Sequence, residues 1–329
     1  MTAGIGARVW GALAIVYVVW GSTYLAIRYA VDTMPPLLSA GVRFLAAGLI
    51  LLAVVVAVRG RAALRMSRAQ AATAAVSGVL LLCGGNGLVS VAEQRVDSGL
   101  AALLVACIPL WIVVLRAGLG DRPGLATSGG VLLGFLGVAL IFLPGDTGDT
   151  DLGYAALCVL ASLSWAAGSL LVTRRPVPAD PLTLTTVEML AGGLALLVVS
   201  PAVGELRGFS VADVSGTSWL AVAYLIVFGS LVAFTAYVWL LGNAPVSLVS
   251  TYAYVNPAVA VLLGVLIADE RLTGATLGGG LVVLAAIAVV VTAESRRQRR
   301  ARAAAPAARD GVPVPAPAAA GVGEACRAG

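Results

Sequence analysis

Two ionisable residues interrupt long apolar stretches of the sequence: Arg43 in VRFLAAGLILLAV and Glu188 in VEMLAGGLALLVV. If these stretches cross a bilayer, each charge costs at least ~2.5–3.5 kcal/mol on insertion scales, so each needs a reason to be there. We expect both side chains to line a central cavity, where Arg43 would hold a substrate carboxylate or pair with Glu188. Glu188 would hold a substrate cation or take up a coupling proton. The alternative is a structural ion pair near a membrane face, because each residue lies only about one to two turns into its stretch.

Uncharged polar residues also stand inside apolar stretches. Asn86 lies in CGGNG, where small neighbours allow close helix approach, and its amide suits helix packing and cavity lining equally well. Asn256 precedes Pro257, which is expected to break its stretch and turn backbone carbonyls towards a cavity, or simply to kink the helix. Tyr252 lies one helical turn before Asn256 on the same face. A ring beside an amide suits an amphipathic organic solute.

Tryptophan is scarce in the chain and stands at matching places. Trp20 and Tyr24 close the first apolar stretch, and Trp165 follows Trp20 by 145 positions. Tryptophan near the end of a span is often only an interfacial anchor. Because Trp20 lies deeper than that, we expect it to line the cavity together with Tyr24 and Trp165. We expect the polar residues of a connector to be solvated caps: Glu93, Gln94, Arg95 and Asp97.

The residue types exclude several kinds of chemistry. The chain has no histidine, and all 21 basic residues are arginine, so the usual proton shuttle and the commonest metal ligand are missing. HExxH and Ser–Lys sites are therefore impossible, which makes an intramembrane enzyme the weaker alternative. No GxxxxGK[ST] motif is present, which argues against nucleotide-driven pumping. The four cysteines form no CxxC pair and are expected to be packing groups, so we expect no metal and no cofactor.

The elements that must hold these residues are apolar helices. Of 329 residues, 60% are hydrophobic and 11% are charged, against about 25% charged in soluble domains. This excludes a conventional soluble enzyme, a disordered chain and a nucleic-acid binder. Runs of about 20 apolar residues cross a bilayer as helices. We predict an all-α membrane protein with ten transmembrane spans: 9–27, 37–58, 71–92, 98–117, 125–143, 152–173, 182–203, 217–240, 246–268 and 274–292.

The arginine distribution predicts the orientation of these spans. Connectors that follow even-numbered spans, together with the two ends of the chain, hold most arginines, whereas acids outnumber arginines in the other connectors. Since cytoplasmic segments carry the excess of arginine, both termini are expected in the cytoplasm.

Residues 294–329 are rich in Ala, Pro, Gly and Arg, and we predict a disordered tail because such a segment buries too little apolar surface to fold.

The ten spans divide into two copies. Residues 42–54 and 187–199 match at eight of thirteen positions, and Pro109 matches Pro257 at an offset of 148. The copies are expected at 9–143 and 152–292. Because each copy has an odd number of spans, the second must enter the membrane from the opposite side, which is the inverted repeat of many secondary transporters. Such a repeat offers two nearly equivalent arrangements, one open to each compartment.

Two stretches carry a family resemblance: VWGSTYLAIRYA…MPPLLSAGVRFLAAG and APVSLVSTYAYVNPAVAVLLGVLIADERLT. They resemble the EamA-domain group of the bacterial drug/metabolite transporter superfamily, and within it the YedA-type exporters. The resemblance covers residues 9–292. It implies ten helices in two EamA repeats and the export of small metabolites or drugs across the inner membrane.

The expected function is therefore secondary active transport by alternating access, with proton coupling as an option. A channel or facilitator for small solutes is the main alternative. The expected partners are a small-molecule substrate and the lipid bilayer, with no nucleic acid, and the protein is expected to be a monomer or a homodimer.

Overall fold

The computed structural model describes residues 6–142, 151–271 and 273–304, with side chains omitted at 246–247 and 298–304. Eight of the described helical segments are long and apolar enough to cross a membrane, and two apolar helices are shorter. Together they confirm the predicted all-α architecture of ten spans.

The first five spans are α1 (Ala7–Val31), α2 (Pro36–Arg59), the run α3–η2–α4 (Arg68–Gly78, Val79–Gly87, Leu88–Ala92), the pair α5–α6 (Ser98–Val105, Ile108–Gly118) and α7 (Leu125–Ile141). The second five are α8 (Leu152–Arg174), α9 (Pro181–Ala202), the run α10–η4–α11 (Gly216–Tyr224, Leu225–Val232, Ala233–Asn243), the pair α12–α13 (Val246–Val249, Tyr252–Ala268) and α14 (Gly274–Ala304). Short turns of 3₁₀ helix, η1 (Arg61–Leu64) and η3 (Val211–Asp213), lie in connectors.

Local sequence sets several helix ends. The equivalent helices α2 and α9 both begin at a proline, Pro36 and Pro181, at the position where a missing backbone N–H costs nothing. Asp180 caps α9 by accepting a hydrogen bond from the Thr183 N–H. Gly60, with φ of 75°, ends α2.

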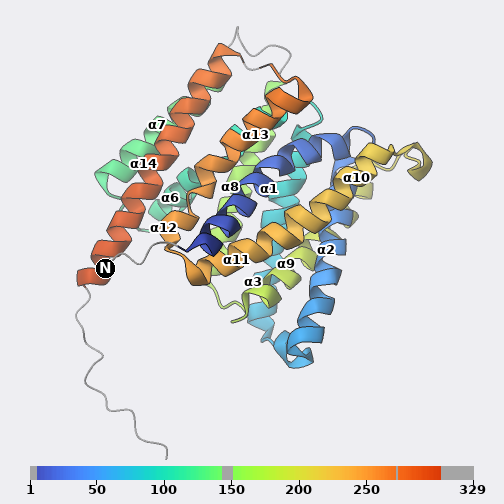
Figure 1. Ribbon diagram of the computed structural model, residues 1–329, viewed down its shortest axis with the longest axis horizontal. Helices are drawn as coiled ribbons and strands as arrows, with labels where there is room; N and C mark the ends of the chain where they lie inside the picture. Colours follow the sequence, from blue (N-terminus) through green and yellow to red (C-terminus); the bar gives the residue numbers. More distant parts are fainter. Residues whose placement is uncertain (1–5, 143–150, 272, 305–329) are drawn as a thin grey trace, which may run out of the picture.

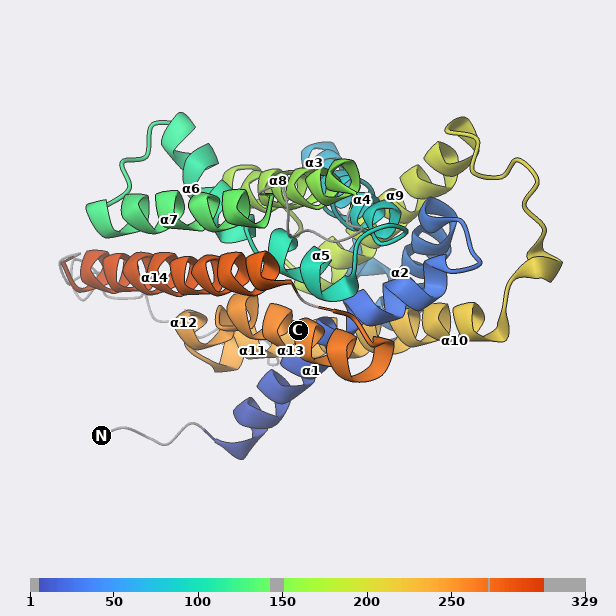
Figure 2. The same ribbon diagram turned by 90° about the horizontal axis from the view of Figure 1, so that it is seen from above.

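The helices form a layered bundle (Figures 1 and 2). Figure 2 shows α7 and α14 side by side at one flank and α2, α9 and α10 towards the other, with α1, α5, α8 and α13 between them. The largest buried apolar cluster joins residues of α1, α5 and α8 among others, including Ile27, Leu104 and Cys158. The middle of the bundle is therefore built from both copies.

Glycine contacts confirm that the two copies are inverted. A β-carbon on Gly48 of α2 would lie 3.1 Å from the Leu190 backbone, and one on Gly193 of α9 would lie 2.6 Å from the Leu45 backbone. Gly193 and Leu190 follow Gly48 and Leu45 by 145 positions. The same contact is thus made twice with the roles exchanged, and α2 runs antiparallel to α9. This is the relation produced by a pseudo-twofold axis perpendicular to the helices.

The third span of each copy contains a π-helical segment, η2 (Val79–Gly87) and η4 (Leu225–Val232). Segments of this kind are rare and frequently lie at functional sites. Each packs against the first helix of the other copy, η2 against α8 and η4 against α1. The repeat therefore places the same irregular backbone at two related positions.

The structure corrects three details of the predicted spans. The fourth span, predicted as continuous, breaks at Ala106–Cys107, because Pro109 cannot donate to the preceding turn and its ring crowds the carbonyl there. The ninth span breaks at 250–251 and not at Pro257, which lies inside α13. The predicted disordered tail was wrong for residues 294–304, which extend α14; residues 305–329 lie outside the described residues.

We predict that Gly78→Ala lowers the free energy of unfolding by about 1–3 kcal/mol, as overpacking does in well-packed interiors. A β-carbon on Gly78 would lie 2.3 Å from the backbone oxygen of Glu188, so α3 and α9 must separate. The matched control is Gly129→Ala in α7, where a β-carbon has nothing within 4 Å. Thermal unfolding of the purified variants should show a lower melting temperature for Gly78→Ala only. Equal melting temperatures for the two variants would contradict this packing.

Candidate functional site

Arg43 is the buried cation at the centre of the candidate site. Its residue is 6% exposed. Its Nε donates to the Ser230 hydroxyl at 3.0 Å, and its guanidinium carbon lies 4.5 Å from the Phe44 ring centroid. Among the described residues, the Ser230 hydroxyl is the one hydrogen-bond partner of the Arg43 side chain. The guanidinium has five N–H donors, so most of its donors have no protein acceptor. Such a group is suited to bind a carboxylate or phosphate.

Gly229 lets α1, α2 and η4 converge around this arginine. A β-carbon on Gly229 would lie 3.3 Å from Arg43 Nη2 and 3.1 Å from Thr23 Cγ2. The Gly229 carbonyl oxygen accepts a hydrogen bond from Trp20 Nε1 at 3.1 Å. The sequence-predicted residues Trp20 and Arg43 therefore meet at one glycine of the π-helical segment.

Aromatic side chains extend the site along α1. Trp20 lies 5.2 Å from Tyr237 and 5.4 Å from Tyr252 between ring centroids. At the neighbouring position, a β-carbon on Gly21 would lie 3.1 Å from the Asn256 backbone oxygen. Asn256 is buried, and its Oδ1 has no hydrogen-bond partner among the described residues. The predicted set Trp20, Tyr252 and Asn256 is thus brought together at the contact of α1 with α13.

The other copy repeats this arrangement with Trp165 and Asn86. A β-carbon on Gly85 of η2 would lie 2.9 Å from Trp165 Cε3, and the Ser164 hydroxyl donates to the Leu80 carbonyl at 2.7 Å. Asn86 is the next residue of the same segment and is partly buried. Trp165 therefore packs on η2 as Trp20 packs on η4.

Arg43 and Glu188 do not form the ion pair that the sequence suggested as one alternative. Glu188 instead accepts a hydrogen bond from the Ser77 hydroxyl at 2.7 Å. The antiparallel packing of α2 on α9 explains the separation, because the two residues lie on opposite sides of the pseudo-twofold axis. They are about seven residues apart along the helix pair, roughly 10 Å at 1.5 Å per residue.

Glu93 is the residue that sequence reasoning missed. It was expected to be a solvated cap, but its residue is 5% exposed and neither carboxylate oxygen has a hydrogen-bond partner among the described residues. The expectation holds for Gln94 and Arg95, which are exposed. Glu93 closes the third span, where the connector folds back onto the bundle. Its burial has no local signal, because it results from packing against α1 and α8.

A cavity of about 630 Å³ lies at this end of the bundle. Its lining is mostly charged and polar, with two valines: Arg28, Val31, Asp32, Glu93, Gln94, Arg95, Val96, Asp97 and Tyr154. Glu93 thus faces this cavity from a buried position.

Interhelical ion pairs stabilise the same end. We refer to Arg28, Asp97, Ser98, Gly99 and Glu270 as the Glu270 cluster. Arg28 Nη1 lies 2.7 Å from Asp97 Oδ1 and 2.5 Å from Glu270 Oε1. Glu270 also accepts from the backbone N–H groups of Ser98 and Gly99 at 2.9 and 3.0 Å, and so caps α5 from another span. Burial and the charge of Glu270 raise the pKa of Asp97, against the effect of Arg28.

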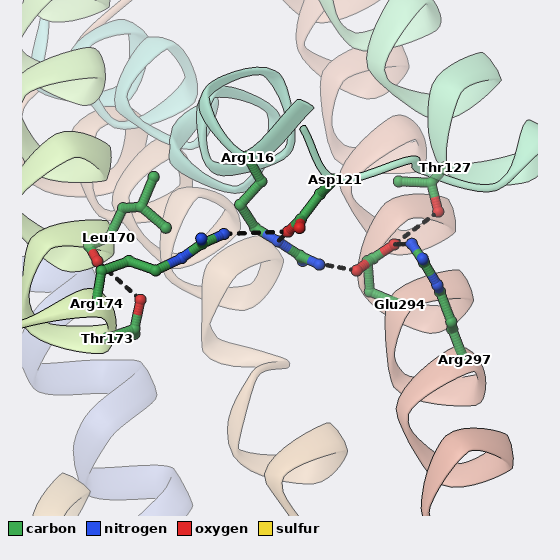
Figure 3. A network of polar contacts seen from close by, with 8 residues as sticks. All are labelled: Arg116, Asp121, Thr127, Leu170, Thr173, Arg174, Glu294 and Arg297. Atoms are coloured by element: carbon green, nitrogen blue, oxygen red, sulfur yellow. Dashed lines mark hydrogen bonds and ion pairs between the residues drawn. The ribbon is translucent and has the colours of Figure 1, made fainter. Parts of the chain in front are cut away.

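A second set of ion pairs stabilises the opposite end (Figure 3). The Asp121 cluster comprises Arg116, Asp121, Thr127, Arg174, Glu294 and Arg297. Asp121 Oδ2 lies 2.8 Å from Arg116 Nε and 3.3 Å from Arg174 Nη2, and Arg116 also binds Glu294 at 2.8 Å. The Arg116 hydrogen bond lowers the pKa of Asp121. The Asp121 side chain is 36% exposed, whereas the Glu270 side chain is 1% exposed.

The two clusters occupy equivalent places in the repeat. Arg28 lies in the last turn of α1, and Arg174 lies in the last turn of the equivalent helix α8. Each binds an acid that follows the fourth span of the other copy, Glu270 after α13 and Asp121 after α6. The same helix-to-helix connection therefore closes both ends of the bundle.

Comparisons with known proteins agree with this architecture. The model of the EamA-like transporter family matches residues 9–143 and 152–292. The uncharacterized inner membrane transporter YedA of Escherichia coli K12 is 40% identical over 279 residues, covering 84% of this chain and 89% of that protein. Protein PecM of Dickeya dadantii is 30% identical, covering 82% and 87%. A solved crystal structure with 21% identity and a TM-score of 0.59 covers 88% of this chain and 98% of its own, and shares the fold.

We predict that Glu270→Ala lowers the free energy of unfolding by about 2–4 kcal/mol, since it leaves two buried N–H groups without their acceptor and Arg28 with Asp97 alone. The matched control is Asp269→Asn: the neighbouring carboxylate is exposed, and asparagine tolerates its left-handed backbone, with φ of 52°. Thermal unfolding in detergent measures both variants. A Glu270→Ala protein as stable as the control would contradict the capping role.

Proposed function

Because this chain belongs to the EamA-like transporter family, we propose that it is a secondary active transporter that exports small organic metabolites or drugs across the inner membrane by alternating access. The observation that carries the proposal is the pair of equivalent clusters at opposite ends of the bundle. Opening the Glu270 cluster while the Asp121 cluster stays closed, and the reverse, gives two arrangements that differ by exchange of the two copies.

The substrate site proposed here lies between the copies, where Arg43 meets Trp20 and η4. Arg43 comes from the first copy, and the Ser230 and Gly229 that contact it come from the second. Movement of one copy against the other therefore changes the site and its access together. A substrate with an anionic group for Arg43 and an apolar or aromatic body for Trp20 and Tyr252 fits these side chains.

The proposed orientation places the Asp121 cluster in the cytoplasm with both termini. Arginines are concentrated at that end, in the connectors 59–68, 116–122 and 174–175 and in residues 296–302. This is the distribution typical of cytoplasmic segments. The cavity beside Glu93 then opens towards the outside.

We predict saturable counterflow in proteoliposomes. Compounds that raise the melting temperature of the purified protein, from a panel of amino acids, sugars, purines and cationic drugs, are the test substrates. Radiolabelled substrate outside should enter vesicles preloaded with the unlabelled compound, with a rate that saturates, as expected for a site exposed to one side at a time.

Arg43→Gln should lower this counterflow at least tenfold, equivalent to about 1.4 kcal/mol, because it removes the buried cation. The control Arg207→Gln removes an exposed arginine of an outer connector, away from the cavity lining, and should leave the rate unchanged. Flux that rises linearly with concentration without counterflow would contradict the carrier mechanism and favour a channel. Equal rates in the two variants would contradict the assignment of Arg43.

A further inference from the structure

We propose that Glu93 is the proton-binding group that couples transport to the proton gradient, and that protons reach it through the cavity at the Glu270 end. This inference rests on the proposed transport function and assigns its coupling site. The sequence-based candidate for the role is Glu188. The two carboxylates differ in what surrounds them, and that difference carries the proposal.

Glu93 is buried without compensation. Both of its carboxylate oxygens have no hydrogen-bond partner of good geometry among the described residues, although the backbone of Arg28 lies nearby. Glu270 has four donors and Glu188 has the Ser77 hydroxyl. An ionised carboxylate in such a place loses its hydration without replacement, whereas the protonated acid does not carry that penalty. Of these three acids, Glu93 is thus the one whose ionised form lacks a hydrogen-bond donor of good geometry among the described residues.

Charged and titratable groups face Glu93 from each of the surrounding elements. They are Arg28 and Tyr24 of α1, Arg43 of α2, Cys158 of α8 and Glu270 after α13. Arg28 is already bound to Asp97 and Glu270. Glu93 lies one residue past the span that ends at Ala92. Its burial raises the pKa of the Glu93 carboxyl group well above its usual value, and Glu270 adds to the increase, whereas Arg28 and Arg43 oppose it.

The cavity gives Glu93 access to solution from one end. Arg28, Asp32, Asp97 and Glu93 all line this cavity of about 630 Å³. A proton that enters from the outside therefore reaches a carboxylate that also interacts with Arg43, the cation of the substrate site. Water and polar side chains along the lining are sufficient to carry a proton to it, and no histidine is needed.

Protonation of Glu93 changes the force between helices. The ionised form attracts Arg43 on α2 and Arg28 on α1, which favours an approach of the end of α4 to these helices. The neutral form removes that attraction. Because Arg43 contacts η4 of the other copy through Ser230, the charge on Glu93 biases how the two copies pack. Proton binding therefore changes the relative stability of the two arrangements that open to opposite sides of the membrane, as coupling requires.

Carbodiimide labelling tests the proton site without any substrate. Dicyclohexylcarbodiimide adds to protonated carboxyl groups in apolar surroundings, and mass spectrometry of the purified full chain in lipid nanodiscs locates the adduct. We expect labelling of Glu93 to fall about tenfold from acidic to alkaline pH, as the acid ionises. Glu93→Gln should abolish this adduct, and Asp213→Asn, an exposed acid outside the cavity lining, should preserve it. An adduct on Glu188 with none on Glu93 would overturn the proposal.

Stability provides a second readout. An acid with a higher pKa in the folded state than in the unfolded state binds more protons when folded, so its contribution to stability is lost as pH rises. The Glu93→Gln protein should therefore melt at a higher temperature than the natural protein at alkaline pH, with the difference shrinking at acidic pH. A pH-independent difference, or a lower melting temperature at alkaline pH, would contradict the assignment.

Coupling is measured in proteoliposomes that contain the pH dye pyranine and the substrate identified by counterflow. The ratio of proton movement to net substrate flux, measured with substrate on one side only, should fall at least tenfold in Glu93→Gln and stay unchanged in Asp213→Asn, an exposed acid outside the cavity lining. An unchanged ratio in Glu93→Gln would overturn the coupling role while leaving the transport function intact. Absence of counterflow in the natural protein would instead contradict the proposed function, and the labelling would still decide whether Glu93 binds protons.

Discussion

The antiparallel contact between equivalent helices is the constraint on which the rest of this structure depends. Helices α2 and α9 meet through Gly48 and Gly193, each against the leucine of the other copy. Helices α7 and α14 also run antiparallel, with Gly130 near Val290 and Gly279 near Ile141. Small residues allow backbones to approach closely in lipid, where packing rather than the hydrophobic effect holds helices together. These contacts fix the inversion and hence the equivalence of the two ends of the bundle.

The inverted arrangement also explains where charge is tolerated. Ion pairs that hold the ends together lie at helix termini, where solvent reaches part of most of these side chains. The buried Glu270 supplements its ion pair with backbone hydrogen bonds. Arg43 and Glu93 lack this support. A buried charge without full compensation is unfavourable for folding, and this is the basis of the proposed roles of the two residues in binding and coupling. The two residues lie on the same side of the pseudo-twofold axis, whereas Glu188 lies on the other.

Much of the fold could be predicted from the sequence, because the bilayer restricts a 20-residue apolar run to one conformation. The number of spans, the repeat and the matching positions of Trp20 and Trp165 all followed from run length and spacing. The break at Ala106–Cys107 and the helical extension to Ala304 were missed, because local proline effects and helix continuation depend on neighbouring packing. Of the residues expected to bind substrate, Trp20, Arg43, Tyr252 and Asn256 do converge, and their role in binding stays a prediction. Glu93 was not predicted, because a polar connector gives no sign that it folds back into the interior.

Distances across the two ends of the bundle test the central claim most directly. Spin labels at Asp32 and Arg271 report on the Glu270 end, and labels at Arg122 and Arg175 report on the Asp121 end, in a chain whose four native cysteines have been replaced. All four label positions are exposed. Asp121→Asn should increase the long-distance population between labels 122 and 175 and decrease it between labels 32 and 271, and Glu270→Gln should do the opposite. Lengthening at both ends together in either variant would contradict alternating access.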